Sequence, residues 1–276
     1  MYVQRATVKS NVSIAGIGLH SGIYTTVELQ PAPAGSGITF VRVDLDGLRI
    51  PALQASTTAL DHATTVGKDD VSVGTVEHLL AALVACGVSD IDILIDAAGV
   101  RLLGSDVRVL RIKEPIEISD GVKSIRITPA NRLSIKYKID FDHPVIGRQS
   151  VHFDFHHDSF LRKIAPARTF GFFKDVEKMR AAGLARGGSV ENAIVLDDRA
   201  VMNGPLRFRD EFVRHKVLDL IGDLALVGRP IVGEITAVRG GHALHSRFVE
   251  KILAVAEEME ESFEGVTTSE PARSFA

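Results

Sequence analysis

The sequence has a single cysteine, no apolar run of membrane-spanning length and no excess of basic residues. One cysteine, Cys86, cannot form an intramolecular disulfide, and its setting in LLAALVACGV predicts a small buried hydrophobic residue rather than a reactive thiol. No apolar stretch approaches the roughly 20 residues that cross a bilayer. We therefore expect no disulfide and no stable membrane insertion.

The charge balance and the N-terminus exclude two further classes. Lys and Arg number 32 against 35 Asp and Glu, and the formal net charge of −3 offers no basic surface to nucleic acid. The N-terminal stretch MYVQRATVKSNVS lacks the apolar centre of a signal peptide. A cytoplasmic protein without a nucleic-acid partner is the expectation.

What is present is an ordinary globular composition over 276 residues, enough for two hydrophobic cores. In the first half, TTVELQPA, GITFVRVDL and DIDILID read as strands, and TVEHLLAALVACG reads as a helix. The second half repeats this order, with strands VKSIRITPA, RLSIKYKIDF and IVGEITAV, a helix over 211–228 and an amphipathic terminal helix. This pattern predicts an α+β fold with two domains, 1–108 and 109–276, each a sheet layer packed against helices.

The helix EFVRHKVLDLIGDLALVG carries His215, Asp219 and Asp223 at intervals of four on an otherwise apolar segment. An i, i+4 step keeps side chains close to one stripe of a helix, so His215 and Asp219 can point at the same ion. Buried ionisable groups must be paired, metal-bound or shifted in pKa. Ion pairs with Arg214 or Lys216 are the alternative to a metal site, and the spacing alone leaves both open.

Two other segments could complete a catalytic metal site. Zinc in such sites has three protein ligands, and His78 in TVEHLL is a candidate for the third. Its neighbour Glu77 is the right kind of group to accept a proton from the attacking water. His242 in the turn GGHAL could pair with Asp223, which would favour the protonated imidazole that a general acid needs.

The chain as a whole resembles the UDP-3-O-acyl-N-acetylglucosamine deacetylases, the zinc amidases that commit Gram-negative bacteria to lipid A biosynthesis. The blocks that carry this resemblance lie in one order along the chain: GIGLHSG, TVEHLLAAL, IDFDHP, ARTFGFF, GGSVENAIV, LRFRDEFVRHKVLDLIGDL and GGHAL. The resemblance implies two domains of similar topology with the active site at their interface. It also implies hydrolysis of the N-acetyl group of UDP-3-O-acyl-N-acetylglucosamine to the free amine and acetate.

The family pattern assigns roles to the residues of these blocks. It implies one Zn²⁺ per chain on His78, His215 and Asp219, with Glu77 as general base and His242 as general acid beside Asp223. Further roles are implied for residues that surround the reacting atoms: Thr169 on the oxyanion, Lys216 near the polar head of the substrate, Lys113 near its diphosphate, and Phe170 against the substrate. An insert near 172–195 would form an apolar passage for the 3-O-acyl chain, with Val176, Leu184, Ala193 and Val195 as candidate walls.

Two other readings remain beside this one. A non-catalytic binder of nucleotide sugars or acyl chains could use the same scaffold, and so could a zinc amidohydrolase for another N-acyl sugar. The expected partner is a small UDP-linked acylated amino sugar, and the expected state is a monomer. His20, in GIGLHSG, lies in a predicted turn between strands and could approach the substrate head group.

One departure from the family pattern is large. Between DIDILID and RIKEP the family normally carries a longer connection, with an IPIxDGS motif followed by a helix. This chain has only AAGVRLLGSDVRVL there, so the first domain is shortened after residue 96. None of the implied zinc ligands lies in the shortened segment.

Overall fold

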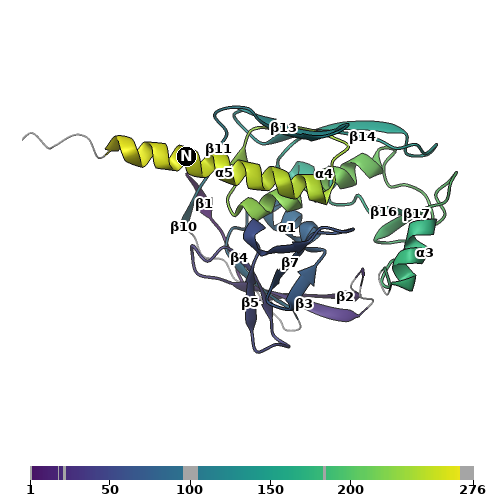
Figure 1. Ribbon diagram of the computed structural model, residues 1–276. Coiled ribbons are helices and arrows are strands. Elements are labelled where there is room, and N and C mark those ends of the chain that lie inside the picture. Colours follow the sequence, from purple (N-terminus) through teal and green to yellow (C-terminus); the bar gives the residue numbers. More distant parts are fainter. Residues whose placement is uncertain (1, 18, 21–22, 96–104, 183–184, 268–276) are drawn as a thin grey trace, which may run out of the picture.

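The computed structural model describes residues 2–17, 19–20, 23–95, 105–182 and 185–267, and Figure 1 shows two sheets on either side of a helical layer. The first sheet has the strand order β2 (Val12–Ile17), β3 (Tyr24–Pro31), β9 (Ile91–Ile95), β4 (Ile38–Arg42), β5 (Leu48–Pro51). The second has the order β12 (Ile116–Asp120), β13 (Lys123–Thr128), β19 (Glu234–Val238), β14 (Ser134–Asp140), β15 (Arg148–Asp154).

The two sheets share one topology. In each, two antiparallel hairpins are followed by a helix, and the last strand then enters between the hairpins. That last strand is antiparallel to one neighbour and parallel to the other: β9 is parallel to β4, and β19 is parallel to β14. The α+β fold class and the similar topology of the two halves are as predicted, whereas the boundary at residue 108 stays a prediction.

Three helices form the layer between the sheets: α1 (Val76–Ala85), α4 (Glu211–Leu224) and α5 (His242–Thr267). α1 belongs to the first half and packs against α4 of the second half, and α4 packs against α5. Alternating apolar residues of the central strands, such as Ile93 and Ile235, are fully buried on the inner side of this layer. The helical layer therefore brings side chains from both halves of the chain together.

Smaller elements surround this core. They are the three-stranded sheet β6 (Thr57–Ala59), β7 (Thr65–Lys68), β8 (Val71–Gly74); the pairs β1 (Tyr2–Arg5) with β10 (Ser105–Arg108), β11 (Leu110–Arg111) with β18 (Ile231–Val232) and β16 (Thr169–Phe172) with β17 (Ala193–Leu196); the helices α2 (His157–Lys163) and α3 (Phe173–Ala181); and the 3₁₀ turns Gln54–Ser56 and Ala225–Val227. None of the described helices is long and apolar enough to span a membrane.

The halves differ at their first edge strand. In the second sheet, α5 packs against β12 and β13, and Ile116 of β12 is 6% exposed. In the first sheet, the equivalent strand β2 leaves Val12 46% and Ile14 57% exposed. The register pairs Val12 with the buried Leu29, so β2 continues the apolar inner row of the sheet but is poorly covered. An apolar strip at a sheet edge is a surface that proteins normally cover.

One expectation from the sequence is wrong. Cys86 is exposed rather than buried, because it forms the C-terminal cap of α1, where the helix ends and the chain turns at Gly87 with a positive φ. The apolar run around it predicts burial for the helix as a whole, but not for the residue that ends it.

Candidate metal centre

The site is built where α1 crosses α4 at close range. A Cβ atom added to Gly222 of α4 would lie 1.9 Å from the backbone oxygen of Glu77 in α1, so only glycine fits at this crossing. Both helices bury their apolar residues, among them Leu80 and Leu220. The close crossing carries the first turn of α1, with Glu77 and His78, over the stripe of α4 that holds His215, Asp219 and Asp223.

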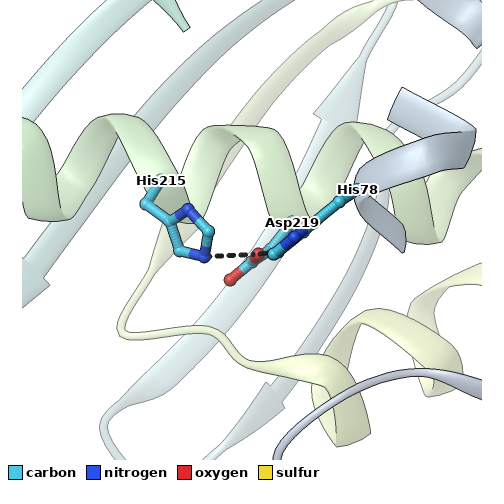
Figure 2. A group of neighbouring side chains, drawn as sticks. All are labelled: His78, His215 and Asp219. Atoms are coloured by element: carbon cyan, nitrogen blue, oxygen red, sulfur yellow. Dashed lines mark ion pairs between the residues drawn. The ribbon is translucent and has the colours of Figure 1, made fainter. Parts of the chain in front are cut away.

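Three predicted ligands converge at this crossing, as Figure 2 shows: His78 from α1, and His215 and Asp219 from α4. The Oδ1 atom of Asp219 lies 3.1 Å from Nε2 of His215 and 3.5 Å from Nε2 of His78. Two ligands of a tetrahedral zinc ion, each bound at about 2.0 Å, are separated by roughly 3.3 Å. This Oδ1 atom is buried and makes no hydrogen bond within the described part of the chain. An orphaned carboxylate oxygen between two imidazole nitrogens fits a metal ion.

Hydrogen bonds to residues outside the group hold two of these ligands, His215 and Asp219, in place. His215 donates from Nδ1 to the carbonyl oxygen of Ala167 at 3.1 Å, which leaves the lone pair of Nε2 free to bind a metal. Lys216 donates from Nζ to Oδ2 of Asp219 at 2.6 Å. Burial raises the pKa of Asp219, but the charges of His215 and Lys216 outweigh burial and hold that pKa well below its usual value. The carboxylate is therefore ionised.

The ion-pair alternative is present only in part. Lys216 pairs with Asp219, whereas Arg214 pairs with Asp210 at 2.6 Å. Since the lysine engages Oδ2 and the two histidines face Oδ1, the ion pair and a metal site are compatible. The structure thus places the Lys216 ammonium on Asp219, in addition to any role it has toward a substrate.

A second group of polar side chains lies one turn further along α4. Asp223 accepts a hydrogen bond from Nδ1 of His242 at 2.8 Å, which is the predicted pairing. The same carboxylate oxygen accepts from Nδ1 of His245 at 2.7 Å, and its other oxygen accepts from the Thr64 hydroxyl at 2.5 Å. Burial lowers the pKa of His242, but the hydrogen bond and charge of Asp223 outweigh burial and raise it to about 9. His242 is therefore protonated at neutral pH.

Glu77 joins the two groups. Its carboxylate is 2% exposed, accepts a hydrogen bond from the backbone N–H of Thr64 at 3.0 Å, and can approach Asp219 and His242 within a single cluster. Burial is the main cause that raises the pKa of Glu77. Thr64 thus contacts Glu77, Asp223 and His242 at once. Sequence reasoning missed it, because a threonine in a polar loop carries no sign of such a role.

A cavity of about 250 Å³ opens beside the metal group, by which we mean His78, His215 and Asp219. Its lining includes His78, His215 and Thr169, so the predicted oxyanion residue shares a cavity with two predicted ligands. The rest of the lining combines apolar with polar side chains: Ala82, Phe160, Ala165, Pro166, Ala167, Leu218, and Arg168, Glu191, Asn192 and Arg207.

A buried ion pair that the sequence analysis did not identify fixes the strand that carries Thr169. Arg168 and Glu211 are 8% and 0% exposed, and Nε of the arginine donates to the carboxylate at 2.9 Å. The guanidinium also donates to the carbonyl oxygens of Val190 and Pro205. Burial raises the pKa of Glu211, but the hydrogen bonds from Arg168 outweigh it and lower that pKa. The pair therefore anchors the chain around Arg168 to the start of α4. The residues on either side of Arg168 are Ala167, which contacts His215, and Thr169.

The other predicted substrate residues differ in how close they lie to the ligands: Lys216 contacts Asp219 directly, and the Phe170 ring lies 6.4 Å from the His215 ring between centroids. The Phe170 ring packs edge-on against Phe212 with 5.0 Å between centroids, and Nζ of Lys216 lies 5.7 Å from the Phe170 centroid. Lys113 lies exposed between β11 and β12. The wall candidates Val176, Ala193 and Val195 are half-buried, in α3 and β17, whereas Leu184 falls outside the described residues.

The pKa of His20 is influenced by His78, one of the predicted ligands. Burial lowers the pKa of His20 first, and the charges of His62 and His78 lower it further.

The fold and the site define a two-sheet α+β protein in which a His₂Asp group, a buried glutamate and an Asp–His pair meet between two halves of similar topology. A family model described as UDP-3-O-acyl N-acetylglycosamine deacetylase matches residues 5–100 and 94–254. A UDP-3-O-acyl-N-acetylglucosamine deacetylase of Myxococcus xanthus (strain DK1622) is 46% identical over 274 residues, which cover 92% of this chain and 87% of the relative. A Helicobacter pylori (strain J99 / ATCC 700824) deacetylase is 37% identical over 294 residues, covering 99% and 98%. The chain belongs to the UDP-3-O-acyl-N-acetylglucosamine deacetylase family.

The comparisons also bear on chain length. The alignment with the Helicobacter pylori relative spans 294 positions against 276 residues in this chain, so it includes positions for which this chain has no residue. The family model matches in two pieces that meet at residues 94–100. The shortening after residue 96 stays a prediction.

Proposed function

We propose that this chain is a zinc-dependent deacetylase that hydrolyses the N-acetyl group of UDP-3-O-acyl-N-acetylglucosamine, in the committed step of lipid A biosynthesis. The observation that carries the proposal is the orphaned Oδ1 of Asp219 between His78 and His215, beside a buried glutamate and a protonated histidine. The names of the relatives support the substrate and the reaction.

His78, His215 and Asp219 would hold the zinc ion. Two imidazoles and one carboxylate are a donor set of catalytic zinc sites, which leave a coordination position to water or substrate. When bound, zinc polarises the amide carbonyl and makes water easier to deprotonate. The contacts of His215 with Ala167 and of Asp219 with Lys216 orient these two ligands.

Glu77 is the general base in this proposal. Its burial raises the pKa of the carboxyl group toward the range in which a carboxylate accepts a proton effectively near neutral pH. The backbone N–H of Thr64 holds one of its oxygens, and the other lies 3.8 Å from Nε2 of His78. Glu77 therefore lies where it can take a proton from water that attacks beside the metal ligands.

His242 is the general acid. The amine must be protonated as the C–N bond breaks, since an amide anion is a very poor leaving group. Asp223 holds Nδ1 of His242 and keeps the ring protonated, so Nε2 carries the proton that is delivered to nitrogen. The Thr169 hydroxyl, in the cavity beside His78 and His215, is the proposed donor to the oxyanion.

The remaining assignments concern substrate binding. We assign Lys216 to the polar head, Phe170 to a contact with the substrate, Lys113 to the diphosphate, and the segment near 172–195 to the acyl chain. α3 supports the last assignment, because none of its residues is buried and it stands away from the core. A monomeric, cytoplasmic enzyme remains our expectation.

Two alternatives predict different products. A non-catalytic binder would hold the UDP-linked acylated sugar without releasing acetate. A zinc amidohydrolase for another N-acyl sugar would release acetate from that sugar faster than from the UDP-linked one. A panel of N-acyl sugars separates these alternatives from the proposed deacetylase.

Removal of one ligand tests the metal site. We expect Asp219→Asn to bind zinc at least tenfold more weakly and to release acetate at least about 10²-fold more slowly, because it replaces the only anionic ligand. Zinc content and acetate release are measured together, before and after treatment with a chelator. Asp210→Asn, which breaks an ion pair of the same helix outside the site, is the matched control. Full zinc content and turnover in Asp219→Asn would contradict the proposal.

The pH dependence tests His242. Because its pKa is raised to about 9, the proton that His242 donates is present below that pH and is lost as the pH rises through it. The rate should therefore fall on the basic side, near pH 9 and well above the pKa of an ordinary histidine. In Asp223→Asn the basic limb should move to lower pH, since the charge that raises the pKa is gone. A basic limb unmoved by Asp223→Asn would assign it to another group.

A further inference from the structure

His245 is a second histidine on the carboxylate of Asp223. It lies one helical turn after His242 at the start of α5, so both rings project from the same face of the helix. Its side chain is 0% exposed, and its Nδ1 lies 2.7 Å from the oxygen of Asp223 that also accepts from His242. The roles proposed above do not involve His245.

Tyr137 fixes the proton on the His245 ring. The Tyr137 hydroxyl, fully buried in β14, lies 3.0 Å from Nε2 of His245. Burial raises the pKa of Tyr137 well above its usual value, so the hydroxyl keeps its proton and donates it to Nε2. Nδ1 of His245 must then carry the ring proton, which it donates to Asp223.

The turn before α5 is shaped to admit this pair. A Cβ atom at Gly240 would lie 2.6 Å from the Tyr137 hydroxyl oxygen and 3.0 Å from Nε2 of His245. Glycine at this position therefore lets the backbone pass close to both side chains. Gly240, the first of the two glycines before His242, thus makes room for the hydrogen-bonded pair.

A second metal site is the other reading of Asp223, His242 and His245, whose polar atoms cluster closely. The two N···O distances of 2.7 and 2.8 Å are those of charge-assisted hydrogen bonds. They are shorter than the roughly 3.3 Å that separates two ligands of a tetrahedral zinc ion. Thr64 already donates to the other oxygen of Asp223. The geometry is therefore that of a hydrogen-bonded chain.

We propose that His245 is a positioning residue, which with Tyr137 fixes the Asp223 carboxylate in the orientation that presents His242 to the metal group. The terminal torsion of an aspartate is broad, so a carboxylate held by Thr64 and His242 alone can rotate. His245 supplies a third donor to the carboxylate, on the same oxygen that His242 uses, and that donor is rigid because Tyr137 holds the buried ring. Its effect on the rate rests on the proposed function, whereas the chain Tyr137–His245–Asp223–His242 does not.

The kinetic test compares two replacements of His245. We expect His245→Leu to lower kcat about tenfold, with KM within about twofold and zinc content unchanged, because a charge-assisted hydrogen bond to Asp223 is lost. His245→Asn should recover kcat to within about threefold, since its amide N–H can take the place of Nδ1–H. Melting temperatures of both variants are measured alongside. Equal kcat in His245→Leu and the unaltered protein, or a loss that Asn does not relieve at equal stability, would overturn the proposal.

A spectroscopic test does not depend on turnover. Histidine ¹H–¹⁵N spectra of the unaltered protein should show His245 as the Nδ1–H tautomer, and Tyr137→Phe should shift the Nε2 resonance of His245, because that nitrogen loses the hydrogen bond it accepts. The Nε2–H tautomer at His245 in the unaltered protein would refute the chain. If the unaltered protein releases no acetate but shows the expected tautomer, the proposed function fails while the hydrogen-bonded chain stands.

Discussion

Replacing Glu77 with glutamine should slow acetate release by about 10²–10⁴-fold while zinc remains bound, because this is the range that a positioned general base contributes. Glutamine keeps the size of the side chain and can still accept the hydrogen bond from Thr64, but it cannot take up a proton. Glu77 is not one of the three predicted zinc ligands, which are His78, His215 and Asp219. In Glu77→Gln, acetate release should therefore fall while the zinc content stays unchanged.

The measurement is acetate release at saturating substrate, together with zinc content per chain. Glu28→Gln is the matched control, because Glu28 is also a buried glutamate, 1% exposed, but lies in β3 of the first sheet. We expect that control to retain turnover to the extent that it stays folded. Full activity in Glu77→Gln would remove Glu77 from the mechanism, and loss of zinc would make it a ligand.

Replacing Gly222 with alanine should destabilise the protein by about 2–4 kcal/mol and impair both zinc binding and turnover. In an exposed helix interior, alanine stabilises the helix by about 1 kcal/mol relative to glycine, so helix propensity alone predicts that Gly222→Ala is stabilising. Here the new Cβ would stand 1.9 Å from the backbone oxygen of Glu77 and 2.8 Å from its Cα. Backbone atoms cannot rotate away, so α1 and α4 must separate.

That separation would affect function because the ligands are divided between the two helices. His78 moves with α1, whereas His215 and Asp219 move with α4, so the distances around Oδ1 of Asp219 should lengthen. Thermal or denaturant unfolding gives the stability change, and zinc affinity gives the change at the site. Gly16→Ala is the control, since no atom lies within 4 Å of the added Cβ. Unchanged stability in Gly222→Ala would contradict this prediction, because α1 and α4 would then separate at no cost in free energy.

The sequence determined the local parts of this protein. The periodicity of α1 and α4 placed Glu77 and His78 on one helix, and His215, Asp219 and Asp223 on one stripe of another, because helical geometry depends only on neighbours along the chain. The alternation in DIDILID and IVGEITAV predicted the central strands for the same reason. Family blocks then associated these helices with a substrate class.

Only the tertiary structure decided how those parts meet. Thr64 and Asp223 are 159 positions apart, and Arg168 and Glu211 are 43 apart, so no local periodicity could pair them. The structure also divided the Asp219 carboxylate between Lys216 and two histidines, which the spacing had left as alternatives. His245 gained its role from a tyrosine in another element. Such contacts depend on the packing of distant segments, and packing is a property of the folded chain as a whole.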